Sequence, residues 1–396
     1  MSSPAALQGL RVLDLTMLLP GPVATLRLAE MGADVLKIEP PGAGDAARVM
    51  MQSAADEVAA RPGAFYRLVN RGKRETRLDL KSEAGRAVLL ALARDADVLV
   101  ESFRPGVMTR LGAGYEALSA INPKLVYCAI SGYGADSPFS DRAGHDLNYI
   151  GYAGVLDQLA GRDGAPALPN FQIADLLGGA LSAVTQILAA LWQVARGGAG
   201  RFIDVSMAHA SYAYNVVAQV ALANDDAAAL QPGGGLLNGG VPCYNLYRTR
   251  DGRWLAIGAL ELKFWQALCK ALGREDWLER HWSLGQAIGG TDAAALTREL
   301  AAIIEAEPLQ VWIDRLEPID CCATPVLTPG EAARHPLFNP HVLQQALAAN
   351  AVAPSGMPKA QQDNTGQRAT GATQGQSGAG AGSPDGNKPF TYGPWG

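Results

Sequence analysis

Two short segments about thirty residues apart carry the side chains best suited to proton transfer or nucleophilic attack. One contains His145 followed directly by Asp146, and the other contains Asp175. An imidazole can exchange a proton near neutral pH, and a carboxylate can act as a base or as a nucleophile. Each residue also has a purely structural interpretation as a helix cap, because each stands before an apolar segment. The residues alone leave both interpretations open.

Helices are predicted directly after both segments. Residues 147–156 can continue as a helix, which would put His145 near a helix N-terminus. The partial positive charge at such an end favours the neutral imidazole that a base requires. Residues 176–194 form a long apolar segment, for which Asp175 is the predicted N-cap. A cap of this kind would hold the Asp175 carboxylate in one orientation.

The first half of the chain alternates strand-like and helix-like segments. Residues 10–15 and 33–38 are strand-like, and residues 23–31 between them have a helical pattern. Strand, helix and strand within about thirty residues predict a parallel βαβ unit with a right-handed crossover. Further strands are predicted at 96–100, 125–130 and 201–206. This alternation indicates an α/β fold with a large Rossmann-like domain built on a parallel sheet.

A dinucleotide site is the first alternative that such a fold suggests. Glu39 follows the second predicted strand, where a dinucleotide-binding protein has the carboxylate that binds the ribose. However, residues 16–22 after the first strand contain no GxGxxG to bring the backbone against a pyrophosphate. The five cysteines fit neither a zinc site nor a disulfide framework. The sequence therefore predicts neither a bound cofactor nor a metal.

A basic segment offers a possible phosphate site. Residues 70–81 of this acidic chain contain five cationic side chains: Arg71, Lys73, Arg74, Arg77 and Lys81. The segment is either a solvated loop or a place for phosphates. Arg104 and Arg110 follow the strand predicted at 96–100, and ligands of open α/β sheets bind beyond the carboxyl ends of the strands. Both arginines are therefore expected near a phosphate or an adenine.

The chain is expected to form two domains and a tail. Residues 1–210 are predicted to form the large domain, completed by about 318–350. Residues 225–317 are predicted to form a smaller α+β domain, with a hairpin turn at Thr249–Gly252. Residues 353–396 consist mainly of Gly, Ala, Gln, Ser and Pro. Such a segment buries too little apolar surface to fold, so it is predicted to be disordered.

Composition excludes several classes of protein. A net charge of −5 argues against a dedicated nucleic-acid-binding protein. The N-terminus lacks the pattern of a secretory signal, and no uninterrupted apolar run reaches the roughly 18 residues of a membrane span. An odd number of cysteines without CxxC pairs is typical of a reducing compartment. We therefore expect a cytoplasmic enzyme with no nucleic-acid or membrane partner.

Five motifs together resemble those of the family III CoA-transferases, over about residues 7–339. They are Gly9–Leu15, Met31–Pro40, Arg71–Lys81, Glu101–Gly106 and Ser131–Gly134. The resemblance implies an interlocked homodimer in which each chain has a Rossmann-like large domain and a smaller domain. It implies an active site between the large domain of one subunit and the small domain of the other. It also implies an acyl-CoA substrate, with CoA near Lys73, Lys81, Arg104, Arg110, Gly144, Asp146 and Tyr149.

The family resemblance has two branches, which use the Asp175 position differently. In the transferases this aspartate attacks the acyl-CoA thioester, and in the racemases it is one of two acid/base groups. The segment Ala143–Tyr149 is similar to the racemase motif, as is Glu261 after the hairpin. The resemblance therefore implies racemisation of a 2-methylacyl-CoA, with Asp175 on one face and His145, paired with Glu261, on the other. A CoA-transferase and a catalytically impaired CoA-binding protein are the alternatives.

Two departures from the family pattern affect these expectations. Racemases of the family carry an arginine after the second strand that contacts a CoA phosphate, whereas this chain has Glu39, Pro40 and Pro41. The basic residues at 71–81 would then carry more of that contact. After His335 the chain turns to low-complexity sequence, where the family has a segment that packs on the large domain. An altered C-terminus of this kind would weaken stability or dimerisation.

Overall fold

The computed structural model describes residues 5–161 and 164–338, which form two compact units. The first unit contains the residues up to Gly144 together with Ala174–Ala210. The second contains His145–Ile173 and the described residues from Ser211 onward. The tail predicted to be disordered, 353–396, lies outside the described residues.

Six parallel strands form the sheet of the first unit. They are β1 (Arg11–Leu15), β2 (Asp34–Glu39), β3 (Arg74–Arg77), β4 (Val98–Glu101), β5 (Val126–Ser131) and β6 (Phe202–Ser206). Their order in the sheet is β3-β2-β1-β4-β5-β6, and every neighbouring pair is parallel. The chain therefore moves outward from β1 to β3 and then returns to the other side of β1. This order confirms the predicted Rossmann-like α/β fold and puts its switch point between β1 and β4.

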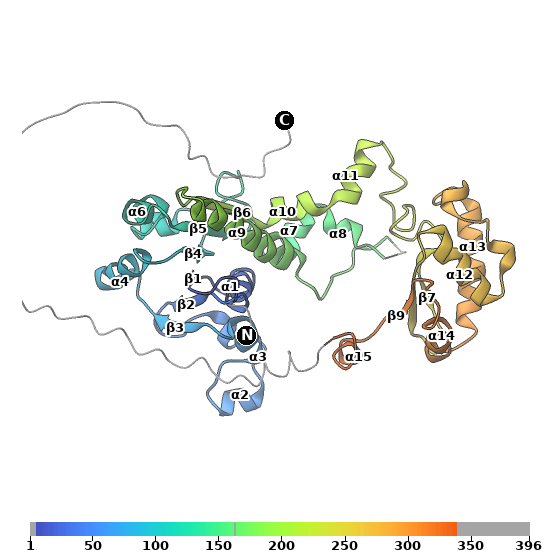
Figure 1. Ribbon diagram of the computed structural model, residues 1–396, viewed down its shortest axis with the longest axis horizontal. Helices are drawn as coiled ribbons and strands as arrows, with labels where there is room; N and C mark the ends of the chain where they lie inside the picture. Colours follow the sequence, from blue (N-terminus) through green and yellow to red (C-terminus); the bar gives the residue numbers. More distant parts are fainter. Residues whose placement is uncertain (1–4, 162–163, 339–396) are drawn as a thin grey trace, which may run out of the picture. The chain divides into compact units, whose positions relative to one another are not determined.

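Helices cover both faces of this sheet (Figure 1). On one face lie α1 (Pro20–Glu30), α3 (Ala64–Asn70) and α9 (Ser182–Ala195), and on the other lie α4 (Glu83–Ala93) and α6 (Tyr115–Ile121). Leu89 of α4 and Leu118 of α6 are fully buried in one cluster with Leu99 of the sheet. Shorter helices are η1 (Ala46–Arg48), α2 (Ala54–Val58) and α5 (Val107–Arg110). The apolar periodicity of α4 and α6 thus directs their buried faces to the sheet.

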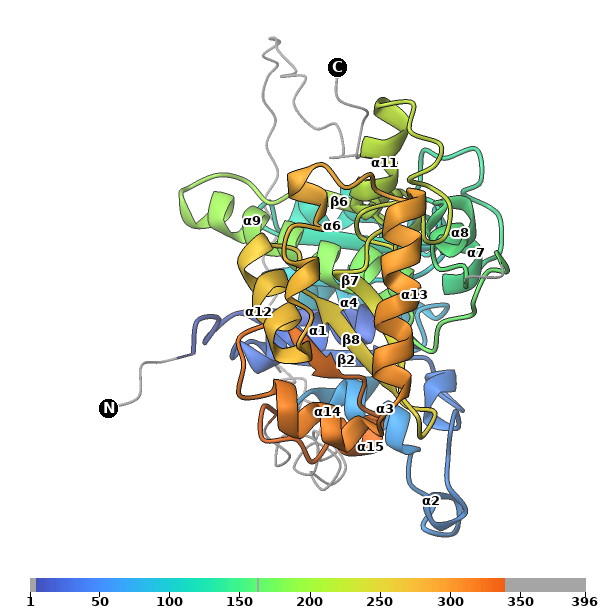
Figure 2. The same ribbon diagram turned by 90° about the vertical axis from the view of Figure 1, so that its right-hand side faces the viewer.

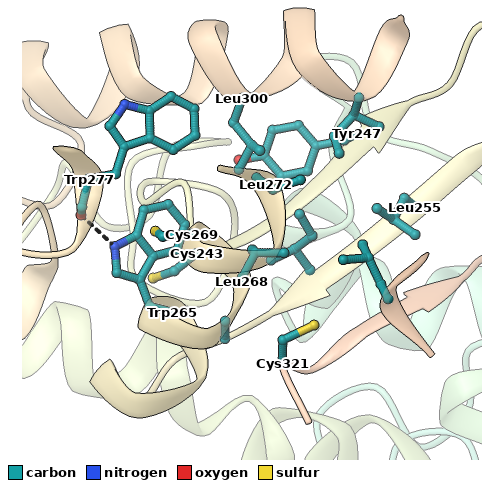
Figure 3. Packing of buried hydrophobic residues seen from close by; sticks show 14 of the residues in the cluster. Cys243, Tyr247, Leu255, Trp265, Leu268, Cys269, Leu272, Trp277, Leu300 and Cys321 are labelled. Atoms are coloured by element: carbon teal, nitrogen blue, oxygen red, sulfur yellow. Dashed lines mark hydrogen bonds between the residues drawn. The ribbon is translucent and has the colours of Figure 1, made fainter. Parts of the chain in front are cut away.

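The second unit contains a three-stranded antiparallel sheet, β7 (Tyr244–Arg248), β8 (Trp254–Gly258) and β9 (Ala323–Pro325). Around it lie α12 (Leu262–Leu272), α13 (Thr291–Glu305) and α14 (Leu309–Leu316), and Figure 2 shows α13 running alongside the strands. Trp265 is fully buried, and its indole N–H donates to the carbonyl of Trp277 at 3.1 Å (Figure 3). This core anchors the start of α12. The other elements of the unit are α7 (Asp146–Tyr152), α8 (Val155–Gln158), α11 (Val216–Ala223), η3 (Glu275–Trp277), η4 (Trp282–Leu284) and α15 (Pro329–Ala332).

The division into units differs from the predicted domains in two ways. Residues 145–173, predicted in the large domain, belong to the second unit. Residues 318–338, predicted to complete the large domain, also belong to the second unit, because β9 pairs antiparallel with β8. The change of unit at Ala210, within α10 (Met207–Tyr214), coincides with the predicted end of the large domain at residue 210.

One helical segment among the described residues is long and apolar enough to cross a membrane. It spans Ala174–Ala195, and half of its most apolar window is buried inside the protein. A Cβ added at Gly179 would lie 2.9 Å from Cβ of Pro20 and 3.1 Å from Sδ of Met207. This close packing is typical of a core helix, which passes the same test of length and composition.

Candidate active site

Asp175 lies inside a helical segment rather than at its cap. The segment η2 (Ala174–Leu181) has π-helical hydrogen bonding and runs directly into α9. The predicted N-cap is therefore wrong, because the helix begins before Asp175 and places it in the first turn. A negative charge in a first turn is still favourable to the helix dipole. Gly179 packs on Pro20, which follows the carboxyl end of β1, so this part of η2 lies near the ligand-binding edge of the sheet.

His145 is the N-cap of α7, as predicted. Its backbone is extended (φ −131°, ψ 177°), and its N–H donates to Oδ1 of Asn148 at 3.0 Å. The carbonyl of His145 accepts the N–H of Asn148 at 2.8 Å and that of Tyr149 at 3.2 Å. The side chain of His145 is exposed. The backbone of this residue thus starts the helix.

Glu261 stands at the start of α12 in the same way. Its carbonyl accepts the N–H of Phe264 at 3.0 Å and that of Trp265 at 3.2 Å. Its carboxylate makes no capping hydrogen bond and is exposed. Since Trp265 is fully buried, the first turn of α12 is firmly held. The helix therefore presents the Glu261 carboxylate from a rigid support.

The three predicted catalytic residues are divided between the two units. Asp175 belongs to the first unit, and His145 and Glu261 belong to the second. Among the described residues of the second unit, His145 and Glu261 form no ion pair with each other. All three lie in the first turn or at the cap of a helical segment. A helix N-terminus stabilises negative charge, which is useful where an enolate or a carboxylate must be held.

Lys73 does not have the environment of a phosphate ligand. Its side chain is fully buried, and its ammonium donates to Oδ2 of Asp14 at 3.0 Å, to the carbonyl of Pro22 at 2.8 Å and to Oδ1 of Asn70 at 2.8 Å. Burial lowers the pKa of Lys73 to about 8, against the opposing attraction of Asp14. Three acceptors use all three ammonium hydrogens. The predicted CoA contact of Lys73 is therefore corrected to a structural role beneath the sheet edge.

Other cations of the basic segment are also engaged within the fold. Arg71 bonds Glu30 and the carbonyl of Leu68, and Arg74 bonds Asp34 through two nitrogens at 2.7 and 2.8 Å. Lys81 is exposed, with no ion pair among the described residues. Of the basic segment, Lys81 is thus the predicted CoA ligand that remains accessible.

Arg104 and Arg110 are exposed near the carboxyl end of β4. Nη1 of Arg104 lies 3.5 Å from the carbonyl oxygen of Asp141. A Cβ added at Gly106 would lie 3.1 Å from Nη1 of Arg110, so this guanidinium folds back over the loop that carries Arg104. Arg104 lies in the loop before α5, and Arg110 is the last residue of α5.

The remaining predicted CoA contacts lie where the chain passes from one unit to the other. Gly144 is the last residue of the first segment of the first unit. Asp146 is the first residue of α7, and Tyr149 is buried in the same helix. These three residues therefore flank His145 along the chain.

Glu39, the carboxylate considered for a ribose, is occupied by protein groups. Its carboxylate accepts from Arg48 at 2.8 and 3.0 Å and from the hydroxyl of Tyr66 at 2.5 Å. Burial alone would raise the pKa of Glu39, but the hydrogen bonds from Arg48 and Tyr66 outweigh it and lower that pKa. A carboxylate held in this way has no capacity left for a ribose.

A buried charged network under the loop after β1 was not predicted. The Lys37 ammonium donates to the carbonyl of Thr16 at 2.8 Å and pairs with Asp45 at 3.2 Å. Asp45 in turn accepts the N–H of Leu18 at 3.1 Å, and Leu18 has a positive φ of 66°. A bulky residue in this conformation is strained and must be held by its surroundings. The network fixes this loop at the switch point. A charged residue within an otherwise apolar strand, such as Lys37 in β2, is the sequence feature that could have indicated it.

Comparisons with known proteins agree with this fold. The model of CoA-transferase family III matches residues 7–374. The chain is 35% identical to α-methylacyl-CoA racemase from Homo sapiens over 334 residues, which is 83% of this chain and 80% of that protein. It is 33% identical to acetyl-CoA:oxalate CoA-transferase from Acetobacter aceti, over 83% of this chain and 82% of that protein.

Solved structures show the same likeness. Rv3272 from Mycobacterium tuberculosis superimposes with a TM-score of 0.70 at 30% identity, covering 84% of this chain and 87% of that chain. A CaiB/BaiF family protein from Brucella suis superimposes with a TM-score of 0.69 at 28% identity, covering 85% and 87% of the two chains. This protein therefore belongs to CoA-transferase family III, and it is an enzyme of the racemase or CoA-transferase type.

Proposed function

We propose that this enzyme interconverts the 2R and 2S forms of a 2-methylacyl-CoA thioester. The observation that carries the proposal is the placement of His145 and Glu261 at the starts of α7 and α12, together with Asp175 in the first turn of η2. Two acid/base groups, one for each face of the α-carbon, are what a 1,1-proton transfer requires. The similarity to α-methylacyl-CoA racemase over most of both chains supports the same reaction.

In the proposed mechanism, Asp175 and His145 exchange roles with the direction of the reaction. One group removes the α-proton from its face, which produces an enolate, and the other returns a proton to the opposite face. Glu261 orients the imidazole of His145 and stabilises its charged form. The backbone N–H of Asp146 donates to the enolate oxygen, where negative charge develops during the reaction. CoA itself is part of the substrate, and no further cofactor is required.

In the proposed binding mode, the CoA phosphates contact Lys81, Arg104 and Arg110, which are exposed on the first unit. We further propose an interlocked homodimer in which Glu261 serves the active site of the partner chain. Exposed apolar side chains along α11, namely Val216, Val217, Val220 and Leu222, support a partner on that helix. A cytoplasmic location fits an enzyme that acts on CoA thioesters.

The test is exchange of the α-proton of a 2-methylacyl-CoA in D₂O without any acceptor acid. The wild-type enzyme should incorporate deuterium, and His145→Ala should lose that exchange while retaining CoA binding. His335→Ala is the control, since His335 is only partly buried and lies outside the proposed site. Normal exchange by His145→Ala would remove the imidazole from the mechanism.

The second candidate is transfer of CoA between carboxylic acids, with Asp175 as the nucleophile. The similarity to acetyl-CoA:oxalate CoA-transferase supports this reaction. Attack by the Asp175 carboxylate on the thioester would release CoA and leave a mixed anhydride on the enzyme. Hydroxylamine would trap that anhydride as a hydroxamate on Asp175, detectable by mass spectrometry of the peptide. CoA binding without exchange or trapping would instead indicate an impaired, CoA-binding relative.

A further inference from the structure

Two buried carboxylates face one cavity in the first unit. Glu101 ends β4, Asp204 lies in β6, and both line a cavity of about 140 Å³. Tyr127 and Ser131 of β5 line the same cavity from between them. The proposed proton transfer uses neither carboxylate. Their burial therefore needs a separate explanation.

Each carboxylate holds the backbone of a different loop. Oε2 of Glu101 accepts the N–H of Phe103 at 2.7 Å, and Oδ2 of Asp204 accepts the N–H of Ala135 at 2.7 Å. The first loop leads to Arg104 and Arg110 of the proposed CoA site. The second begins with Gly134, whose φ of 86° turns the chain, and leads toward the segment before His145. The pair thus fixes the starts of both loops.

Among the described residues, no lysine or arginine lines this cavity. The titratable groups around Glu101 come from α6, β5 and β6: Tyr115, Glu116, Tyr127, Cys128 and Asp204. His209 acts electrostatically on Asp204. Burial, and then the charge of Asp204, raise the pKa of Glu101 to about 7. Burial and the nearby Asp136 raise the pKa of Asp204.

We propose that Glu101 is a positioning residue for CoA binding, and that a proton on Glu101, in the same cavity as the Asp204 carboxylate, keeps the segment from Arg104 to Arg110 in place. With the proton present, Glu101 remains an acceptor for Phe103 and its repulsion with Asp204 is removed. Loss of the proton favours any movement that brings the Glu101 carboxylate to water, and such a movement carries the loop away. CoA binding should therefore weaken as pH rises. This inference rests on the proposed contact of CoA with the two arginines.

The first experiment compares the dissociation constant for CoA, by calorimetry from pH 6 to 8.5, in wild type, Glu101→Gln and Glu101→Ala. Glu101→Gln preserves the acceptor without the titrating charge, so it should bind CoA with wild-type affinity at pH 6. At pH 8.5 its dissociation constant for CoA should be lower than that of wild type by about threefold or more. Glu101→Ala lacks the acceptor and should bind about tenfold more weakly at every pH, with kcat for α-proton exchange nearly unchanged.

Titration of the CoA phosphates affects the pH profile of every variant equally, so its effect cancels when wild type is compared with Glu101→Gln. Glu116→Gln is the matched control, because Glu116 lines the same cavity but is exposed. It should follow the wild-type profile. Amide hydrogen exchange adds a readout without ligand: the N–H of Phe103 should exchange faster in Glu101→Ala and, above pH 7, faster in wild type than in Glu101→Gln.

Equal pH profiles of wild type and Glu101→Gln would overturn the proton-linked role of Glu101. Wild-type CoA affinity of Glu101→Ala would overturn its positioning role. A wild-type enzyme without measurable CoA binding would overturn the proposed function and this inference together. The first two results, obtained with a wild type that does bind CoA, would overturn the inference alone.

Discussion

Lys73 and Lys81 belong to one basic segment, but the fold gives them different environments. Lys73 is buried and bonded to Asp14, whereas Lys81 is exposed. Lys73→Met would leave the Asp14 carboxylate buried without its cation, so the unfolding free energy should fall by about 3–5 kcal/mol. Lys81→Met should change stability by less than about 0.5 kcal/mol and weaken CoA binding. Urea unfolding and calorimetry measure the two effects. Equal stability of both variants would contradict the structural role assigned to Lys73.

Glu101 gives a second prediction at the residue scale, in stability. A carboxyl group with a raised folded pKa contributes stability that is fully present below its unfolded pKa, 4.5, and is lost as pH rises through about 7. Glu101→Gln removes this titration. The variant should therefore gain stability relative to wild type as pH rises from 4.5 to 7, by up to about 3 kcal/mol. Thermal unfolding at several pH values measures the difference, and a difference that does not change with pH would be inconsistent with a buried, titrating Glu101.

Among the elements, η2 depends on close approach to α1. Gly179→Ala would put a methyl group 2.9 Å from Cβ of Pro20, so η2 must shift, at a cost of about 1–3 kcal/mol. The same shift would move Asp175 and lower kcat for exchange. Gly151→Ala in α7 is the matched control, because a Cβ there meets nothing within 4 Å and should be neutral or stabilising. Thermal unfolding and exchange rates test the pair, and an unaffected Gly179→Ala would show that η2 tolerates the methyl group.

The elements also show what can be predicted from a sequence. Five strands of the large sheet and the helix that follows His145 have local patterns and were predicted, whereas β3 lies in the basic segment and was not. The start of η2 was misplaced by a few residues, because aspartate is favoured both at an N-cap and in the first turn of a helix. The burial of Lys73 and the cavity of Glu101 and Asp204 could not be predicted. Both features depend on which strands become neighbours in the sheet. The sequence around a charged residue does not reveal whether the fold will bury its side chain.

For the whole molecule, dimerisation is the property to test. Val217 on α11 is exposed in the single chain, among other exposed apolar side chains of that helix. Val217→Asp should place a charge in the proposed dimer interface and shift the enzyme toward monomer in analytical ultracentrifugation. Val58→Asp is the control, because Val58 is exposed on α2 in the first unit. If wild type sediments as a monomer, Glu261 cannot serve a partner chain.

The second unit is assembled from two separate stretches of chain, and the first unit also resumes after an interruption. On a ribosome, the chain up to Gly144 emerges with β5 at the edge of an incomplete sheet, since β6 spans residues 202–206. An unpaired edge strand can pair with another chain. Residues 145–173 likewise cannot pack into their unit until the residues from Ser211 onward have been synthesised. Chaperone demand during synthesis should therefore be greatest between the completion of β5 and that of β6, and a release of the chain within that interval should give aggregates.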